Sequence, residues 1–310
     1  MISRKDKLLG GMWGLLVGDA AGVPYEFHSD DEIALLDYID IIPPKNFERS
    51  HNSVKAGTWS DDGAQALCLL DSLIYCGKLE LQDFAERLLK WYEEGYFAVD
   101  ENVFDVGIQT AESLRAFRNG MSPEKSGMIR INGKGNGSLM RVLPLALWHK
   151  GSDEELVEDA HKQSLVTHGH TCNQVCCAIY CLLSRKILNG LDISEGYAEA
   201  VKSLRNIYSK YPKFEEELEW SIRPDENAVG HGDGYVVDCL RSAIMVLKEN
   251  DTYEKVIKAA ISLGNDTDTT AAVAGGIAGI KYGVQSIPQK WMKIMRGKDL
   301  VEDVFEKLIK

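Results

Sequence analysis

The segment Gly264-Asn265-Asp266-Thr267-Asp268-Thr269-Thr270 constrains this fold more than any other. Its carboxylates and hydroxyls precede an apolar helical pattern, and a cluster of the same character, Thr58-Trp59-Ser60-Asp61-Asp62-Gly63, lies about two-thirds of the chain before it. Adjacent carboxylates repel each other unless a positive charge lies between them. We therefore expect folding to bring the two clusters together around bound cations.

Together the clusters offer four Asp carboxylates and two or three Ser or Thr oxygens. Such all-oxygen donors suit hard cations such as Mg²⁺, Mn²⁺ or Ca²⁺. Four carboxylates carry too much charge for one divalent ion with open positions, so we favour two ions, as in two-metal hydrolytic sites. The alternative for each cluster alone is an ordinary helix N-terminus, where Asp and Ser are common caps.

The spacing of apolar residues predicts an all-α protein, because they recur three and four positions apart nearly everywhere. Clear examples run from Phe84 to Tyr92, from Val175 to Leu188 and from Val236 to Leu247, while Tyr38 to Ile42 is the best strand candidate. No fixed-period repeat or low-complexity linker divides the chain. We expect a single compact domain over residues 1–310, with many helices and a dinuclear metal site in a cleft.

Composition excludes several classes of protein. The 310 residues carry 47 acidic and 35 basic side chains, a formal net charge of −12, whereas a nucleic-acid-coating surface needs a basic stripe. No segment reaches the ~18 uninterrupted apolar residues of a membrane span. Gly10, Gly14 and Asp19 break the first apolar run, so we expect no signal peptide. We expect a cytoplasmic protein with no nucleic-acid or membrane partner.

Four of the seven cysteines fall in one predicted helix: Cys172, Cys176, Cys177 and Cys181. One interpretation is a thiolate metal site, but none follows the paired Cys-x-x-Cys spacing of zinc sites. The simpler interpretation is that they are small buried apolar side chains in a reduced cytoplasm.

Two further segments contain candidate binding or catalytic groups. Gly133-Lys134-Gly135-Asn136-Gly137-Ser138 leads into a helical pattern, and backbone N–H groups at such a start bind phosphate. A flexible turn with an Asn or Ser cap explains the same pattern. Glu26 follows a Pro-containing turn among apolar neighbours, where burial would raise its pKa as a general acid or base requires. A surface turn glutamate is the alternative.

Taken in chain order, these segments resemble the ADP-ribosylglycohydrolase family. The matching motifs are Gly18-Asp19-Ala20-Ala21-Gly22-Val23-Pro24-Tyr25-Glu26-Phe27, Gly57-Thr58-Trp59-Ser60-Asp61-Asp62, Gly135-Asn136-Gly137-Ser138-Leu139-Met140-Arg141, Thr167-His168, Gly234-Tyr235-Val236-Val237-Asp238 and Gly264-Asn265-Asp266-Thr267-Asp268-Thr269. They run from about residue 7 to about residue 284, nearly the whole chain. The resemblance implies an all-α fold with two Mg²⁺ or Mn²⁺ ions at the bottom of a cleft.

The resemblance also implies roles for individual residues. Motif position gives six metal ligands: Ser60, Asp61, Asp62, Asp266, Asp268 and Thr269. It gives catalytic roles to Asp61 and to Glu26, which matches the family's mobile glutamate beside the reacting ribose. The implied substrate-binding residues are Asn136, Gly137 and Ser138 of the loop that holds the diphosphate, with His168, Asp105 and Tyr235.

The implied activity is metal-dependent removal of ADP-ribose from a modified target, by cleavage of the bond at C1 of the distal ribose. The favoured target is protein arginine or another side chain. The alternatives are a free ADP-ribose derivative, an ADP-ribosylated nucleobase, or a non-catalytic ADP-ribose-binding module. Two departures from the family pattern, Gly63-Ala64-Gln65 after the first cluster and Asn265 in the second, replace no implied ligand and bear on substrate preference.

Overall fold

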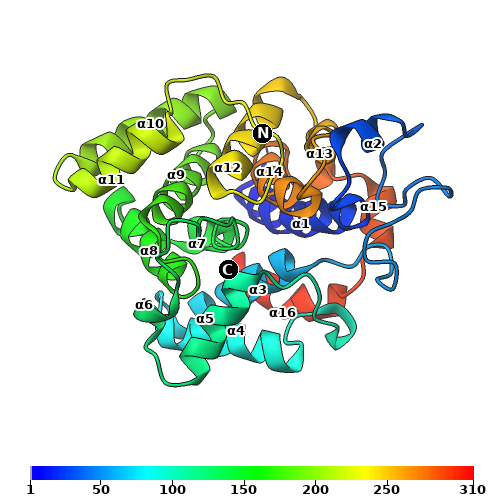
Figure 1. Ribbon diagram of the computed structural model, residues 1–310. Helices are drawn as coiled ribbons and strands as arrows, with labels where there is room; N and C mark the ends of the chain where they lie inside the picture. Colours follow the sequence, from blue (N-terminus) through cyan, green and yellow to red (C-terminus); the bar gives the residue numbers. More distant parts are fainter. Residues whose placement is uncertain (1) are drawn as a thin grey trace.

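The computed structural model describes residues 2–310, and these form a layered assembly of helices (Figure 1). The helices, with η marking 3₁₀ segments and one π segment (η3), are α1 (Arg4–Gly22), η1 (Val23–Tyr25), α2 (Asp30–Ala34), α3 (Asp61–Cys76), α4 (Leu81–Glu94), η2 (Val99–Glu101), α5 (Ile108–Arg118), α6 (Pro123–Ser126), α7 (Leu143–Trp148), α8 (Asp153–Leu165), α9 (Thr171–Leu188), α10 (Ile193–Tyr208), α11 (Pro212–Glu216), η3 (Glu217–Ile222), α12 (Val236–Glu249), α13 (Tyr253–Ile261), α14 (Thr267–Tyr282), η4 (Val284–Ser286), α15 (Gln289–Ile294) and α16 (Lys298–Leu308). The predicted all-α class and single compact domain are confirmed.

The predicted strand at Tyr38 to Ile42 is wrong: between residues 2 and 310 only isolated β-bridges form. A side chain takes the place of a strand partner here. The Tyr25 hydroxyl donates to the carbonyl oxygen of Asp40 over 2.7 Å and accepts from the Asp40 backbone N–H over 3.1 Å. Both backbone groups of Asp40 are thus satisfied without a sheet.

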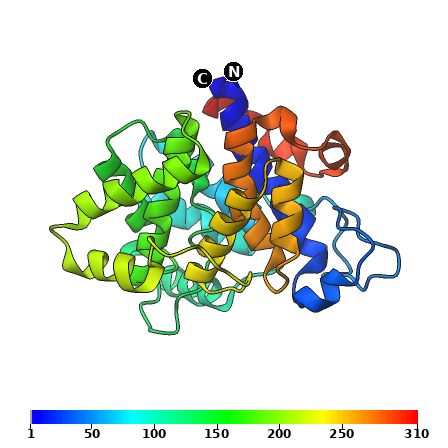
Figure 2. The same ribbon diagram turned by 90° about the horizontal axis from the view of Figure 1, so that it is seen from above.

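Helices α1 and α14 pack backbone against backbone and lie side by side in both views (Figures 1 and 2). Glycine recurs at every fourth position of α1: Gly10, Gly14, Gly18 and Gly22. A Cβ placed on Gly14 would lie 2.3 Å from the carbonyl oxygen of Gly275, and one on Gly22 would lie 2.4 Å from the Cα of Asp268. Only residues without a Cβ permit this approach. The contact brings the start of α14 against the end of α1.

The cysteines lie mostly in the protein core. All seven cysteines are free and all but Cys76 are buried, which agrees with their interpretation as small apolar side chains. In the part of the chain that the structure describes, no helix combines the length and apolar character needed to cross a bilayer.

Candidate active site

The first acidic cluster forms the N-terminus of α3, and α1 holds it there. Ser60 is the N-cap residue, and its hydroxyl accepts a hydrogen bond from the backbone N–H of Asp62 over 3.3 Å. The carboxylate of Asp19 accepts from the backbone N–H groups of Ser60 and Gly63, each over 2.8 Å. Asp19 is fully buried, and this burial raises its pKa to about 7. The carboxylate of Asp19 therefore fixes where α3 begins.

The second acidic cluster forms the N-terminus of α14 and meets the first, as the sequence predicts. Asp266 is the N-cap residue, and Asp268 and Thr269 lie buried in the first turn. The Thr269 hydroxyl donates to the Asp62 carboxylate over 3.3 Å. Two segments from opposite parts of the chain thus form one site.

The donor set fits a hard cation. One oxygen of Asp62 and one of Asp268 are buried without a hydrogen-bond partner. Burial first, and neighbouring carboxylates second, raise the pKa values of Asp61, Asp62 and Asp268. Among residues 2–310, no lysine or arginine forms an ion pair with a carboxylate of either cluster. Buried, unpaired carboxylates of this kind are stabilised by a bound cation.

Glu26 faces the second cluster and is buried, which excludes the surface-turn alternative. Glu26 directly follows η1, and the residue is only 4% exposed. One ligand oxygen from each of Glu26, Asp266 and Asp268 lies within 4.8 Å of the other two. Burial raises the pKa of Glu26 to about 8, and a hydrogen bond with His51 opposes that rise. The structure therefore provides the raised pKa that the sequence led us to expect.

His51 is a functional candidate that the sequence analysis missed. Its Nε2 lies 2.5 Å from Oε2 of Glu26, and its ring centroid lies 5.1 Å from that of Phe104. Potential ligand atoms of Glu26, His51 and Asp105 also lie within 4.8 Å of one another. His51 has a φ of +50°, in a loop whose sequence gives no sign of this tertiary contact.

A cavity of about 340 Å³ opens onto these groups. It is lined by eight of the predicted site residues: Glu26, Asp61, Asp105, Asn136, Gly137, His168, Asp266 and Thr269. Ser60, Asp62 and Asp268 do not line this cavity and are almost fully buried. The wall also contains Ile108, Gln109 and Met140, to which the sequence pattern assigns no role.

The glycine-rich loop reaches the second acidic cluster through Asn136. The Asn136 side-chain amide donates to Oδ2 of Asp266 over 2.8 Å. A Cβ on Gly137 would lie 2.7 Å from Cε1 of His168, so a larger residue would displace the ring. Burial lowers the pKa of His168 to about 3, so this imidazole is neutral at physiological pH.

Comparison with known proteins places this arrangement in a family. A sequence model of the ADP-ribosylglycohydrolase family matches residues 1–310. This chain belongs to the ADP-ribosylglycohydrolase family. It is an enzyme of the glycohydrolase class, as its relatives are. The family hydrolyses ADP-ribose from arginine or other targets.

Individual relatives of this ADP-ribosylglycohydrolase cover most of its length. It is 30% identical to the ADP-ribosylarginine hydrolase Tri1 of Pseudomonas putida (strain GB-1), over 98% of this chain and 78% of the relative. It is 26% identical to the ADP-ribosyl-[dinitrogen reductase] glycohydrolase of Rhodospirillum rubrum, over 94% and 90% respectively. A solved structure of an ADP-ribosylglycohydrolase-related protein complex matches with a TM-score of 0.78 and 27% identity, covering 99% of this chain and 98% of that one.

Two predicted substrate-binding residues of this ADP-ribosylglycohydrolase lie outside the cavity lining. Ser138 is fully buried, and its hydroxyl accepts from the hydroxyl of Ser164 over 2.9 Å. Tyr235 pairs its backbone with Gly135 in an isolated bridge, while its hydroxyl lies 3.9 Å from Sγ of Cys172. Motif position locates these residues beside the site but does not determine where their side chains point.

A buried hydrogen-bond chain orients Asp61 in this ADP-ribosylglycohydrolase, and the sequence analysis missed its role. The Gln65 side-chain amide donates to Oδ2 of Asp61 over 2.8 Å, and its oxygen accepts from Nη1 of Arg141 over 2.9 Å. All three side chains are almost fully buried. A metal-binding carboxylate held by such a partner keeps a fixed orientation.

Gly63 and Asn265, which lie in the two departures noted from the sequence, each occupy a position with a structural constraint. A Cβ on Gly63 would lie 2.7 Å from Cδ2 of Leu16 and 2.8 Å from Cγ of Trp59, so the core leaves no space there. Asn265 has a φ of +61°, a left-handed conformation that Gly and Asn adopt most readily. Its backbone carbonyl accepts from the N–H of Phe27 over 2.7 Å, which ties the second cluster to the loop that follows Glu26.

Proposed function

We propose that this enzyme removes ADP-ribose from a modified side chain by hydrolysing the bond at C1 of the distal ribose, with two divalent cations, Mg²⁺ or Mn²⁺. The meeting of Asp62 and Thr269, beside two buried carboxylate oxygens without partners, carries this proposal. Protein arginine is the favoured linkage, because a relative 30% identical to this chain is named an ADP-ribosylarginine hydrolase.

The proposed cation ligands are Ser60, Asp61, Asp62, Asp266, Asp268 and Thr269. Their hard oxygen donors and unbalanced negative charge support Mg²⁺ or Mn²⁺ over softer ions. Bound cations would supply Lewis acidity, polarising the ribose hydroxyls and lowering the pKa of a water molecule. Three of these ligands, Asp61, Asp266 and Thr269, also line the cavity, and Asp61 is the one from the first cluster that can act toward substrate.

The protein's own groups then bind and orient the substrate. Glu26 is the proposed general acid or base, because its raised pKa allows proton transfer near neutral pH. Cleavage at C1 passes through an oxocarbenium-like state, as in other glycoside hydrolysis. The loop containing Asn136 and Gly137 is proposed to hold the diphosphate, and binding energy from this distant group orients the ribose. Asp105 and His168 complete the proposed substrate contacts from the cavity wall.

A free ADP-ribose derivative or an ADP-ribosylated nucleobase would use the same groups, so the test compares linkages. Arginine-, serine- and nucleobase-linked ADP-ribose are each incubated with Mg²⁺, with Mn²⁺ and with EDTA, and release of free ADP-ribose is followed. We expect metal-dependent release, fastest from arginine. Full activity in excess EDTA would contradict the mechanism. Tight binding without release from any substrate would indicate a non-catalytic module.

A further inference from the structure

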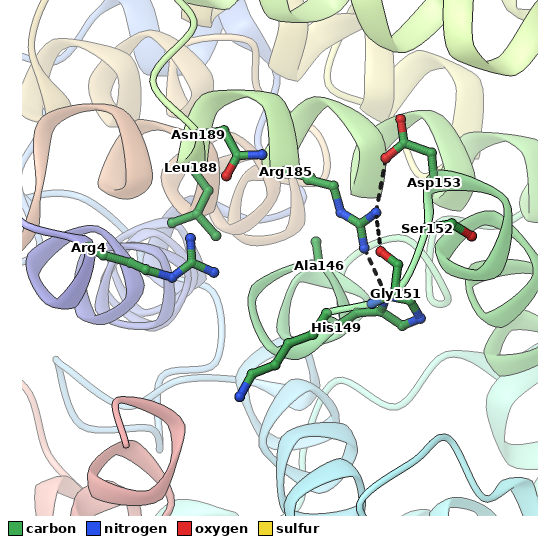
Figure 3. A pocket seen from close by; sticks show the side chains of 10 residues that line it. Arg4, Ala146, His149, Gly151, Ser152, Asp153, Arg185, Leu188 and Asn189 are labelled. Carbon is green, nitrogen blue, oxygen red and sulfur yellow. Dashed lines mark hydrogen bonds and ion pairs between the residues drawn. The ribbon is translucent and has the colours of Figure 1, made fainter.

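A second cavity, of about 420 Å³, lies where α1 begins and where α7 and α9 end. Its wall is basic. Arg4 from α1 and Arg185 from α9 lie on this wall (Figure 3), and Lys150 follows α7. This concentration of positive charge occurs in a chain with a net charge of −12.

Arg185 is held rigidly at this cavity. Its Nη1 donates to the carbonyl oxygen of Gly151 over 3.0 Å and to Oδ1 of Asp153 over 2.9 Å, and its Nη2 lies 2.8 Å from Nδ1 of His149 (Figure 3). Burial, and Arg185 itself, lower the pKa of His149, so its neutral Nδ1 accepts from Arg185. Nε of Arg185 has no hydrogen-bond partner among residues 2–310. The guanidinium is therefore oriented in advance with donor capacity left over.

Two of the three cationic side chains that line the cavity have no ion-pair partner in the described chain. Across residues 2–310, neither Arg4 nor Lys150 forms an ion pair. Asp153 already binds two cations, Arg185 at 2.9 Å and Lys186 at 2.8 Å. Glu155, which accepts from the Ser152 backbone N–H over 2.7 Å, adds a second negative charge near Arg185, while Arg4 and Lys150 stay without an ion-pair partner among the residues described. An adjoining cavity of about 240 Å³ shares Arg4 and Lys150 and adds Lys5, Lys310 and Lys307, of which Lys307 pairs with Asp303 over 3.8 Å.

This basic cavity is separate from the catalytic cleft. Arg4 begins α1, whose 19 residues end at Gly22, shortly before Glu26. At 1.5 Å per residue, the helix separates the two ends by roughly 28 Å. Arg185 likewise lies near the end of α9, while His168 precedes its start. The two cavities have no lining residue in common.

We propose that the basic cavity binds a small anion carrying two or more phosphate groups. A fixed guanidinium is suited to phosphate oxygens, and lysine adds a mobile point charge. A cavity of about 420 Å³ has the size typical of small-molecule sites. The two unpaired cations, Arg4 and Lys150, give a second phosphate its counter-charge.

Inorganic pyrophosphate is the probe, titrated calorimetrically into the full-length protein in EDTA, where no cation in the cleft competes for it. We expect 1:1 binding with a Kd on the order of 0.1 mM, weakening as KCl rises from about 50 to 200 mM. The double variant Arg4→Glu/Lys150→Glu should raise the Kd at least about tenfold. Absence of saturable binding below about 10 mM would overturn the proposal.

A matched control separates the site from overall charge. Lys45→Glu/Lys210→Glu makes the same change in net charge at two exposed lysines outside the cavity, and its Kd should stay within about twofold of the original. Equal weakening in both double variants, or none in the first, would also overturn the proposal. If the first variant fails to fold by circular dichroism, Arg4→Ala and Lys150→Ala should each raise the Kd about threefold or more. An unchanged Kd in both would count against the site.

Discussion

The hydroxyl of Thr269 donates a 3.3 Å hydrogen bond to the carboxylate of Asp62 across 207 positions of sequence. This contact exists because glycines let the backbones of α1 and α14 approach closely, which places Asp268 against Gly22. Asp19, also on α1, caps the helix that contains Asp62. The α1–α14 interface therefore determines both sides of the proposed cation site.

Substituting Gly14 by alanine tests that interface. Its Cβ would lie 2.3 Å from the carbonyl oxygen of Gly275, a backbone atom that cannot move alone, so Gly14→Ala should lower the free energy of unfolding by about 2–4 kcal/mol. Gly196→Ala is the control, because its nearest neighbour is the end of the flexible Ile187 side chain. That change should stay within about 1 kcal/mol of the original. If urea unfolding shows the same loss of stability in Gly14→Ala and Gly196→Ala, the close packing of α1 against α14 is not what stabilises the protein.

Gln65 should raise the affinity of the proposed cation site by orienting Asp61. Gln65→Met keeps the volume but removes the donor to Oδ2 of Asp61, so Mn²⁺ affinity should fall about 10–100-fold. Gln163→Met removes another partner of Arg141 without touching Asp61, and should leave Mn²⁺ affinity near the original value. Calorimetric titration of Mn²⁺ into both variants measures the two affinities. The hypothesis fails if they bind Mn²⁺ alike.

The hydrogen bond between Glu26 and His51 should set the pH at which the enzyme loses activity on the acidic side. Glu26→Gln should lower kcat about 10²–10⁴-fold, because it cannot transfer a proton. The His51 hydrogen bond favours ionised Glu26, so its removal in His51→Ala should raise the pKa of Glu26. Where Glu26 acts as base, the acidic limb of the kcat/KM profile then moves to higher pH. An unmoved limb in His51→Ala would rule out this positioning role.

Metal-free protein should lose stability as pH rises. Burial raises the pKa of Glu26 to about 8 and raises those of Asp61, Asp62 and Asp268, whereas unfolded carboxyls titrate near pH ~4. Between these values the native state binds more protons than the unfolded state, so the free energy of unfolding falls with rising pH. In EDTA, Tm should be lower at pH ~8 than at pH ~5.5.

Bound cations should reverse this trend, since they replace protons among the carboxylates. The increase of Tm on adding Mg²⁺ or Mn²⁺ should therefore be larger at pH ~8 than at pH ~5.5. Differential scanning calorimetry at both pH values measures it. A metal-induced increase that does not depend on pH would mean that the buried carboxylates are not the ligands.

Much of the fold and site follows from local sequence pattern. Helical periodicity is strong enough to predict the all-α class. The repulsion between adjacent carboxylates predicts that the two acidic clusters meet around a cation; their meeting is confirmed by the contact of Thr269 with Asp62, and the shared cation stays a prediction. Asn136 and Gly137 are predictable as site residues because a glycine-rich loop before a helix is a local signal. Each of these inferences starts from a pattern formed by residues close together in sequence.

Other contacts between segments far apart in the chain could not be predicted from the sequence. The position of His51 against Glu26 depends on the course of a long loop, and Gln65 gains its role only when Arg141 approaches from another segment. The Tyr38 to Ile42 prediction failed for the same reason, because the Tyr25 hydroxyl takes the hydrogen bonds of a strand partner. The direction of a loop side chain also depends on contacts with distant segments, as for Ser138, whose hydroxyl accepts from Ser164.

Calorimetric titration of Mn²⁺ into three aspartate variants tests the central claim most directly. The original protein should bind two Mn²⁺ per chain. Asp62→Asn and Asp268→Asn remove one carboxylate from each cluster, and each should weaken Mn²⁺ binding about 100-fold or more and abolish release of ADP-ribose. Asp303→Asn, on the exposed face of α16, should change neither. Wild-type Mn²⁺ binding in both Asp62→Asn and Asp268→Asn would contradict a cation site shared by the two clusters.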